Sequence, residues 1–159
     1  MKIGLIVYSQ TGNTLQVAET LQKALVSAGH DAQLERITVA DANFKSTEMP
    51  VFTNTPDVSA YDMLYMAAPV QGFSLCRAMK AYLAQLDTLA QKPVACFVTQ
   101  FFPKAWMGGK NAVKQMCEEI AHKGGEIVAT GVINWSNKQK DAQIEQLVKD
   151  LVSASPVNL

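Results

Sequence analysis

The amino-acid sequence predicts an α/β protein in which helices cover both faces of a parallel β-sheet. Two observations carry this prediction. Short apolar runs rich in branched residues alternate along the chain with segments whose apolar residues recur every three or four positions. Strands and helices that alternate in this way form parallel sheets through right-handed crossovers. A chain of 159 residues also suits one hydrophobic core, so we expect a single domain over residues 1–159.

The first half of the chain is predicted to hold two strands, one helix and a long crossover. Residues 2–8 form a continuous apolar run, which is typical of a strand buried on both faces. Residues 13–28 change to a helical period that Gly29 ends. Residues 32–37 alternate weakly and predict an outer strand. Residues 38–59 contain two prolines and no sustained period, so we expect an irregular crossover with at most a short helix.

The second half of the chain repeats the alternation of strand and helix three times. The predicted strands are residues 61–68, 92–99 and 126–133. The predicted helices are residues 76–90, 109–123 and 139–152. With the two strands of the first half, these segments make a sheet of five strands.

Composition and charge exclude several classes of partner. The 14 lysine and arginine residues balance the 14 aspartate and glutamate residues, which gives no electrostatic reason to expect nucleic acid or an anionic membrane. No apolar stretch reaches membrane-spanning length, and the first residues lack the pattern of a signal peptide. None of the three cysteines has C-x-x-C spacing, so we expect no metal site, and free thiols suit a cytoplasmic protein.

Ligands of an open parallel sheet bind beyond the carboxyl ends of its strands, so the turns after the strands are the candidate sites. The turn after the first strand gathers hydroxyl and amide side chains around one glycine. Its residues are Ser9, Gln10, Thr11, Gly12, Asn13 and Thr14. Backbone N–H groups at the start of a helix attract anions, and the turn has no cationic side chain, so it predicts a phosphate site built from neutral donors. The alternative is an ordinary helix cap, which needs only one such residue.

This turn resembles the phosphate-binding loop of the flavodoxin family, whose pattern is Ser/Thr-x-Thr-Gly-Asn-Thr. The resemblance extends over the whole chain and is nearest to short-chain flavodoxins, because no long insertion interrupts the last strand. It implies a flavodoxin-like three-layer α/β/α fold, a five-stranded parallel sheet in the order 2-1-3-4-5, and FMN as the cofactor. Other ligand-binding turns at this edge do not match, since the chain lacks a dinucleotide fingerprint, a Gly-Lys-Ser/Thr ending and an acidic cluster after the first strand.

The resemblance implies that the turn after the central strand lines one side of the flavin ring. The predicted contacts of this turn are Pro69, Val70, Gln71, Gly72 and Phe73. The resemblance also implies that the peptide at Gly72 turns over when the flavin takes up an electron, which a glycine permits because it tolerates both signs of φ. The alternative is that Pro69 and Gly72 only form the turn and that Phe73 belongs to the core.

The turn after the next strand is rich in aromatic residues. Its predicted contacts are Thr99, Gln100, Phe101, Phe102, Trp106, Gly108 and Gly109. Aromatic side chains at this edge should cover a ligand, and the resemblance implies that one of them stacks on the flavin. Trp106 is the first candidate and Phe101 or Phe102 the next, although Trp106 is alternatively a lid residue that packs on its own loop. The resemblance also implies that the backbone at Gly108 and Gly109 approaches the pyrimidine end of the ring.

The predicted function is electron transfer through a non-covalently bound FMN, with a redox protein as the partner and no catalytic residue in the chain itself. The main alternative is an NAD(P)H-dependent FMN-containing oxidoreductase of the quinone-reductase kind, although such enzymes carry insertions that this chain lacks. A third possibility is a flavin-binding sensor or accessory module. Because flavodoxins that act as low-potential shuttles are strongly acidic, the formal charge of zero predicts a less negative potential and weaker steering of the partner.

Overall fold

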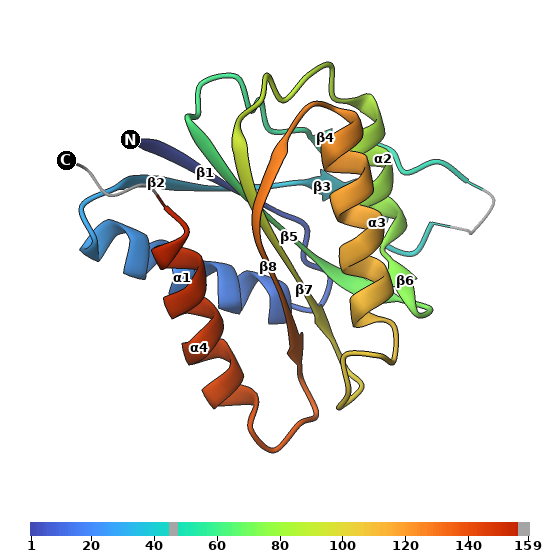
Figure 1. The fold of residues 1–159 in the computed structure, drawn as a ribbon. Helices are drawn as coiled ribbons and strands as arrows, with labels where there is room; N and C mark the ends of the chain where they lie inside the picture. Colours follow the sequence, from blue (N-terminus) through green and yellow to red (C-terminus); the bar gives the residue numbers. More distant parts are fainter. Residues whose placement is uncertain (45–47, 156–159) are drawn as a thin grey trace.

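The computed structural model describes residues 1–44 and 48–155 and has a parallel sheet at its centre (Figure 1). Its strands lie in the order β2-β1-β5-β7-β8, which confirms the predicted order 2-1-3-4-5. Their bounds are β1 (Lys2–Val7), β2 (Asp31–Arg36), β5 (Met63–Gln71), β7 (Pro93–Gln100) and β8 (Glu126–Asn134). All neighbours in this order pair in parallel, so the carboxyl ends of the strands meet at one edge.

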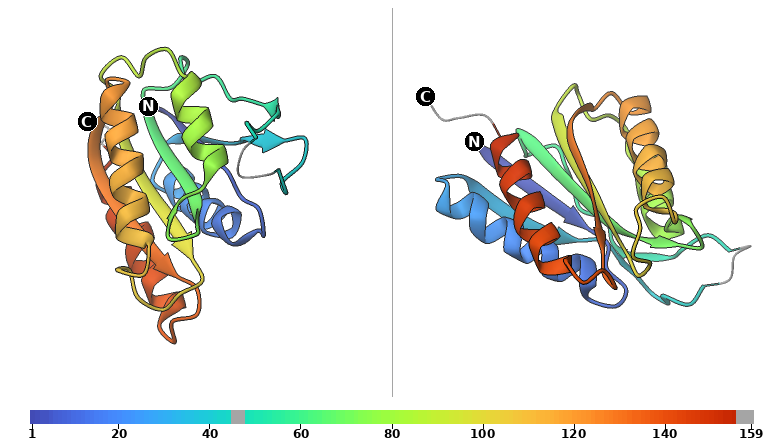
Figure 2. Two further views of the ribbon diagram at one scale, coloured as in Figure 1. Left: turned by 90° about the vertical axis from the view of Figure 1, so that its right-hand side faces the viewer. Right: turned by 60° about the horizontal axis from the view of Figure 1, so that its bottom comes forward.

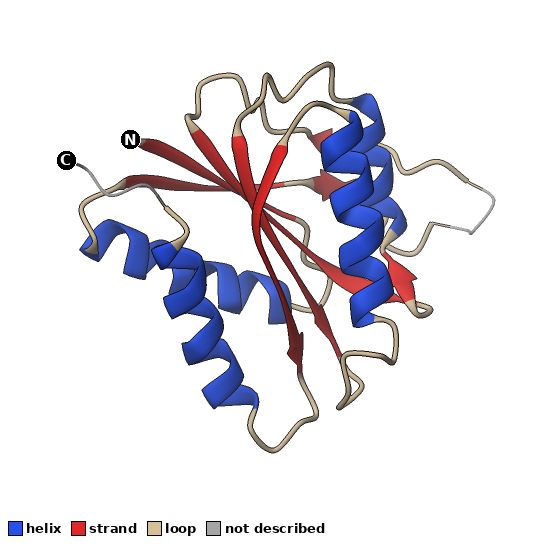
Figure 3. Cartoon of the chain, in the orientation of Figure 1, coloured by secondary structure: helices blue, strands red, loops and turns tan. Residues whose placement is uncertain are grey.

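Helices cover both faces of the sheet, as predicted (Figures 1 and 3). The helices α1 (Asn13–Ser27) and α4 (Lys140–Ser153) pack on one face. The helices α2 (Arg77–Gln85) and α3 (Gly109–His122) pack on the other face. The structure therefore has three layers, α/β/α.

Each central strand divides its side chains between two hydrophobic cores. Ile6 and Cys96 point to the core under α2 and α3, whereas their neighbours Leu5 and Phe97 point to the core under α1 and α4. Alternate residues of a strand face opposite sides of the sheet, and here both sides are buried. This two-sided burial explains why the strands are continuous apolar runs in the sequence.

The crossover over residues 38–59 differs from the prediction. Its described part contains two short strands, β3 (Thr38–Val39) and β4 (Phe52–Asn54), which pair in antiparallel fashion, and no helix. The hydroxyl groups of Thr38 and Thr53 lie 2.6 Å apart and join the two strands. Outside these two strands the described residues are irregular and hold no helix, as expected. The expectation missed the strands, because pairing between residues distant in sequence leaves no local period to detect.

The helix predicted over residues 76–90 is shorter and ends at Gln85. Beyond it, the N–H of Ala90 donates to Thr88 Oγ1 at 3.0 Å, a local side-chain contact that replaces helical hydrogen bonding. Leu89 is nevertheless buried, so the apolar spacing continues past the end of the helix. Spacing alone therefore predicted a helix that was too long.

Packing of α3 on β7 brings two cysteines together. The Sγ atoms of Cys96 and Cys117 lie 3.7 Å apart. A hydrogen bond from the Cys96 thiol lowers the pKa of Cys117 to about 7, and the same contact, together with burial, raises the pKa of Cys96. Burial also raises the pKa of the third thiol, Cys76, to about 12.

These shifts predict that Cys117 is the thiol that reacts near neutral pH. Because the thiolate is the nucleophile, its alkylation rate should rise with pH, with a midpoint near 7, and then level off. Cys96→Ala removes the donor and should move this midpoint up, toward that of an ordinary thiol. Iodoacetamide labelling across a pH series, with the sites identified by mass spectrometry, measures both midpoints. A Cys117 midpoint that does not change in the variant would contradict the proposed hydrogen bond.

Candidate cofactor site

The three turns predicted to bind a cofactor meet at the carboxyl edge of the sheet, which the right-hand view of Figure 2 brings forward. We name them the β1–α1 turn (residues 8–12), the β5–β6 turn (residues 72–73) and the β7–α3 loop (residues 101–108). Gln71 Nε2, at the end of β5, donates to Gln10 Oε1 of the β1–α1 turn at 2.5 Å. The hydroxyl of Thr14 lies 2.7 Å from that of Thr99, at the end of β7. Direct side-chain contacts therefore join the predicted residues of the turns.

The β1–α1 turn leaves backbone donors free at the start of α1. Ser9 Oγ accepts hydrogen bonds from the N–H groups of Gly12 and Leu15, both at 3.2 Å. The N–H groups of Asn13 and Thr14 have no acceptor among residues 1–44 and 48–155. The first turn of α1 holds no acidic residue, so the positive end of the helix is not neutralised there. This donor set suits an anion such as a phosphate group.

The conformation of the β1–α1 turn depends on Gly12. Its φ is +97°, in the left-handed region, and a Cβ atom at this position would have no neighbour within 4 Å. An ordinary helix cap, which is the alternative, needs only the Ser9 hydroxyl as an acceptor. It gives no role to Thr11, which is exposed. The Thr14 hydroxyl is buried against Thr99 instead of facing solvent, so it positions the helix start within the protein.

Arg36 is a cation beside this turn that sequence reasoning missed. It is the last residue of β2, and the parallel register places it next to Val7 of β1. Its guanidinium donates to the carbonyl of Ser9 at 3.4 Å. A phosphate in the turn would therefore have a positive charge nearby, although the turn itself contains only neutral donors. The signal in the sequence was an arginine at the end of an outer strand, but only the register brings it to the turn.

The turn after the central strand begins later than predicted. Pro69, Val70 and Gln71 are strand residues, because β5 continues into an antiparallel pair with β6 (Ser74–Leu75). The prediction that they belong to a turn was wrong, since the apolar run ends before the strand does. The pairing leaves two residues, at positions 72 and 73, to reverse the chain.

The β5–β6 turn has two successive residues with positive φ. Gly72 has a φ of +57° and Phe73 a φ of +64°, which is the pattern of a type I′ hairpin. Glycine adopts this conformation freely, whereas a phenylalanine there costs about 1–2 kcal/mol. Strained residues of this kind cluster at functional sites.

Aromatic rings join the β5–β6 turn to the β7–α3 loop. The ring of Phe73 stacks on that of Phe102, with centroids 5.2 Å apart and an angle of 5° between the planes. Phe73 is also 54% exposed, so it does not belong to the core. Phe101 and Trp106 are each 72% exposed, which argues against Trp106 as a lid packed on its own loop. Two large exposed rings at this edge offer surfaces that a flat ligand would cover.

The two glycines at the end of the β7–α3 loop are required by packing within the protein. A Cβ atom on Gly108, whose φ is +112°, would lie 2.7 Å from the Cα of Phe73. A Cβ atom on Gly109 would lie 2.7 Å from Val132 Cγ1 and 3.2 Å from the side chain of Gln100. The absence of side chains at both positions therefore lets the loop approach the β5–β6 turn and the end of β7.

Gln100 places an unsatisfied acceptor at the end of β7. Its Nε2 donates to the carbonyl of Lys104 and to Asn134 Oδ1, both at 2.6 Å. Its Oε1 is buried and has no hydrogen-bond partner among the described residues. A buried acceptor normally has a donor, from water or from a ligand. Asn134 is a further residue that sequence reasoning missed, and it fixes the side chain of Gln100.

The sequence model of the flavodoxin family matches residues 5–146. This chain belongs to the flavodoxin family. The match spans most of the chain and confirms the family that the β1–α1 turn indicated. Because FMN combines an anionic phosphate with a ring N–H donor, the free donors at the start of α1 and the orphaned Gln100 oxygen fit this group. The individual contacts stay predictions.

Solved flavodoxins share the fold of this family member at low sequence identity. A flavodoxin from Streptococcus pneumoniae TIGR4 is 19% identical with a TM-score of 0.67, and the match covers 98% of this chain and 100% of that one. Oxidised flavodoxin 1 from Bacillus cereus is 17% identical with a TM-score of 0.69, covering 97% and 96%. A flavoprotein from Lactobacillus acidophilus NCFM, in complex with FMN, is 18% identical with a TM-score of 0.66, covering 91% and 97%.

A curated relative has an enzymatic name. The NAD(P)H quinone oxidoreductase YCP4 of Candida albicans is 29% identical, and the match covers 84% of this flavodoxin-family chain. The match covers 51% of the relative, so the chain spans about half the length of the curated protein that it matches. Within residues 1–44 and 48–155, no helix has the length and apolar content that crossing a bilayer requires.

Proposed function

We propose that this flavodoxin-family protein is an electron carrier that holds FMN at the carboxyl edge of its sheet. The observation that carries the proposal is the β1–α1 turn, where the N–H groups of Asn13 and Thr14 are free at the start of a helix that lacks acidic residues in its first turn. Family membership and the FMN complex of the Lactobacillus acidophilus relative support FMN as the cofactor.

The proposed roles follow from the donors and apolar surfaces at this edge. The start of α1, with Ser9 and Thr11, would hold the phosphate, and Arg36 would add a positive charge beside it. The β5–β6 turn and the β7–α3 loop would enclose the ring, with Trp106 as its stacking partner. FMN supplies reversible one- and two-electron chemistry when bound, and the protein positions it and limits access of water.

Stepwise anaerobic reduction in the presence of FMN tests this proposal. We expect bound-flavin absorption bands and, part-way through the reduction, a long-wavelength band that appears and then disappears, because a carrier separates its two one-electron steps. FMN bands identical to those of free FMN would refute cofactor binding. Loss of the flavin bands without any long-wavelength band would refute a one-electron carrier.

A second candidate function is NAD(P)H-dependent reduction of quinones. The observation that favours it is the curated relative YCP4, whose name states that activity. The two functions differ in one simple measurement. NADPH alone should leave the bound flavin of a carrier oxidised, whereas an enzyme of this class would bleach it rapidly and then oxidise NADPH in step with an added quinone.

We also propose that the physiological partner is a redox protein and that the protein acts in the cytoplasm as a single domain. The free thiols support a reducing compartment, since Cys96 and Cys117 lie side by side without a disulfide. An electron carrier usually exchanges electrons with a partner protein. Fluorescence microscopy of the tagged protein in its host tests the location.

A further inference from the structure

Lysines concentrate on the part of the site edge that β7 and β8 form. The β7–α3 loop with the start of α3, and the β8–α4 loop (residues 135–139) with the start of α4, contain four lysines and one acidic residue, Asp141. We name the four lysines the basic rim: Lys104, Lys110, Lys138 and Lys140. The segment of the β1–α1 turn adds no charge of either sign.

Hydrogen bonds hold the two lysine-bearing loops against each other. The N–H of Ser136 donates to the carbonyl of Phe101 at 3.0 Å. The side chain of Asn137 donates to the carbonyl of Pro103, also at 3.0 Å. Both loops lie at the same end of the molecule in Figure 1. The basic rim is therefore one surface and not four separate charges.

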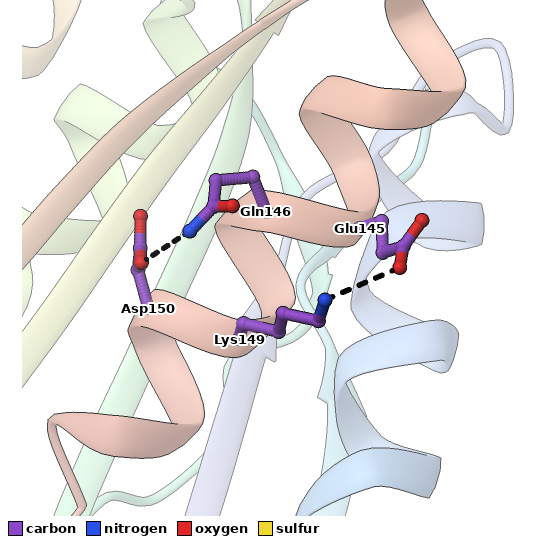
Figure 4. Close-up of polar contacts among 4 residues, drawn as sticks. All are labelled: Glu145, Gln146, Lys149 and Asp150. Carbon is purple, nitrogen blue, oxygen red and sulfur yellow. Dashed lines mark hydrogen bonds and ion pairs between the residues drawn. The ribbon is translucent and has the colours of Figure 1, made fainter.

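No ion pair with a described residue neutralises the basic rim. The ion pairs that the described part of the chain contains lie on the outer faces of two helices, away from this edge. Lys114 pairs with Glu118 at 4.0 Å on α3, and Lys149 pairs with Glu145 at 3.3 Å on α4 (Figure 4). The formal charge of zero therefore hides an uneven distribution of charge.

Five of the 14 acidic residues lie at the opposite end of the sheet. The starts of the strands and the connections that precede them carry five carboxylates. They are Asp31, Asp57, Asp62, Asp87 and Glu126. At the same end, the Nζ atoms of Lys92 and Lys123 donate to backbone carbonyls of Val58 and Ala84. The expectation that zero total charge weakens steering therefore overlooks the charge of the edge itself.

An apolar surface borders the basic rim. Phe101 is 72% exposed and Phe102 is 38% exposed, and both belong to the β7–α3 loop, which carries Lys104 and is followed by Lys110 in the first turn of α3. Exposed aromatic residues surrounded by charge are typical of a surface that docks another protein. The basic sign of the rim requires a partner surface of acidic sign.

We propose that the edge of the sheet bearing the candidate cofactor site docks an acidic protein surface, with the basic rim as its charged border and Phe101 at its apolar centre. This inference rests on the proposed function, because an electron carrier has to dock its partner where electrons enter and leave the flavin. The partner is therefore an acidic redox protein.

Equilibrium binding to a probe of known charge tests the inference without depending on FMN. The probe is a plant-type ferredoxin, a small acidic iron–sulfur protein, with the basic protein cytochrome c as its counterpart. We expect ferredoxin binding to weaken about tenfold between about 20 mM and about 300 mM salt, because screening shortens the reach of the rim. Binding to cytochrome c should be weaker than binding to ferredoxin at low salt. The reverse order would overturn the proposal.

A double variant, Lys104→Gln with Lys138→Gln, locates the effect on the rim. It should weaken ferredoxin binding at low salt by about three- to tenfold and flatten the salt dependence. The matched control, Lys23→Gln with Lys149→Gln, removes the same charge from the bodies of α1 and α4 and should change the affinity less than twofold, which is within about 0.4 kcal/mol. Equal losses in both variants would overturn the assignment to the rim.

Two other occupants of the edge have distinct signatures. If the rim binds a phosphate-bearing dinucleotide, NADPH should bind in a salt-sensitive way and the rim variant should weaken that binding. Ferredoxin should then not bind. If the rim binds the acidic end of a second copy of this chain, sedimentation of the protein alone at low salt should reveal a dimer. Either result would overturn the proposal, whereas failure of FMN to bind while ferredoxin docks would refute only the proposed function.

Discussion

Replacing Gly108 with alanine should destabilise the fold by about 2–5 kcal/mol and separate the two turns proposed to enclose the flavin ring. A φ of +112° strains any residue with a side chain, and the new Cβ would lie 2.7 Å from the backbone of Phe73, which cannot move like the end of a flexible side chain. The melting temperature should fall by about 5–15 °C. FMN affinity should fall as well, because the rings of Phe73 and Phe102, which join the two turns, would no longer stack on each other.

Gly124→Ala is the matched control for this variant. Gly124 lies beyond the other end of α3, has a φ of +85°, and a Cβ there would meet only Thr88 Oγ1, at 3.9 Å. The control should lose about 1–2 kcal/mol from backbone strain alone and keep its FMN affinity. Thermal unfolding and FMN titration of both variants give the comparison. If Gly108→Ala is no less stable than Gly124→Ala, the close approach to Phe73 is not a constraint.

Trp106→Ala should weaken FMN binding by about 30- to 1,000-fold, which corresponds to about 2–4 kcal/mol. The indole is 72% exposed without the cofactor, so covering it removes apolar surface from water and adds ring stacking. The stability of the protein without FMN should change little, because the side chain has few contacts to lose.

Phe101→Ala distinguishes stacking by Trp106 from a general need for aromatic residues in this loop. Phe101 lies in the same loop and its side chain is as exposed as that of Trp106, so it serves as the matched control. Titration of each variant with FMN, followed by the quenching of flavin fluorescence, gives both affinities. A large loss in Phe101→Ala with none in Trp106→Ala would assign the stacking to Phe101 and contradict our choice.

The sheet could be predicted because burial leaves a direct record in the sequence. β1 and β7 are covered on both faces, so their residues form apolar runs that no exposed element would show. Parallel order then brings the turns after β1, β5 and β7 to one edge, and the position of the candidate site follows from topology. The contacts of Gln10 with Gln71 and of Thr14 with Thr99 agree with that expectation.

The features that were missed depend on pairing between segments distant in sequence. Arg36 reaches the β1–α1 turn only because its strand pairs in register with β1. Phe73 adopts a positive φ against its own preference, because the pairing of β5 with β6 leaves two residues to close the hairpin. Sequence patterns describe local preference, and they do not record which distant strands will pair.

The distribution of charge strengthens one expectation about the reduction potential of the cofactor. The total charge predicts a potential less negative than that of acidic flavodoxins, and a basic rim beside the site acts in the same direction, because positive charge favours added electrons. Each tenfold preference for the reduced cofactor corresponds to about 59 mV in a one-electron step. Spectroelectrochemical titration measures this quantity, and a second potential as negative as in acidic flavodoxins would contradict it.

The binding of FMN compared with riboflavin, measured by the quenching of flavin fluorescence, tests the central claim most directly. The two ligands share the flavin ring and differ in the phosphate, so their ratio isolates the β1–α1 turn. Two charge-assisted hydrogen bonds from the free N–H groups of Asn13 and Thr14 predict that FMN binds at least about 100-fold more tightly. Equal affinities for the two flavins would show that the turn does not hold the phosphate and would contradict the account.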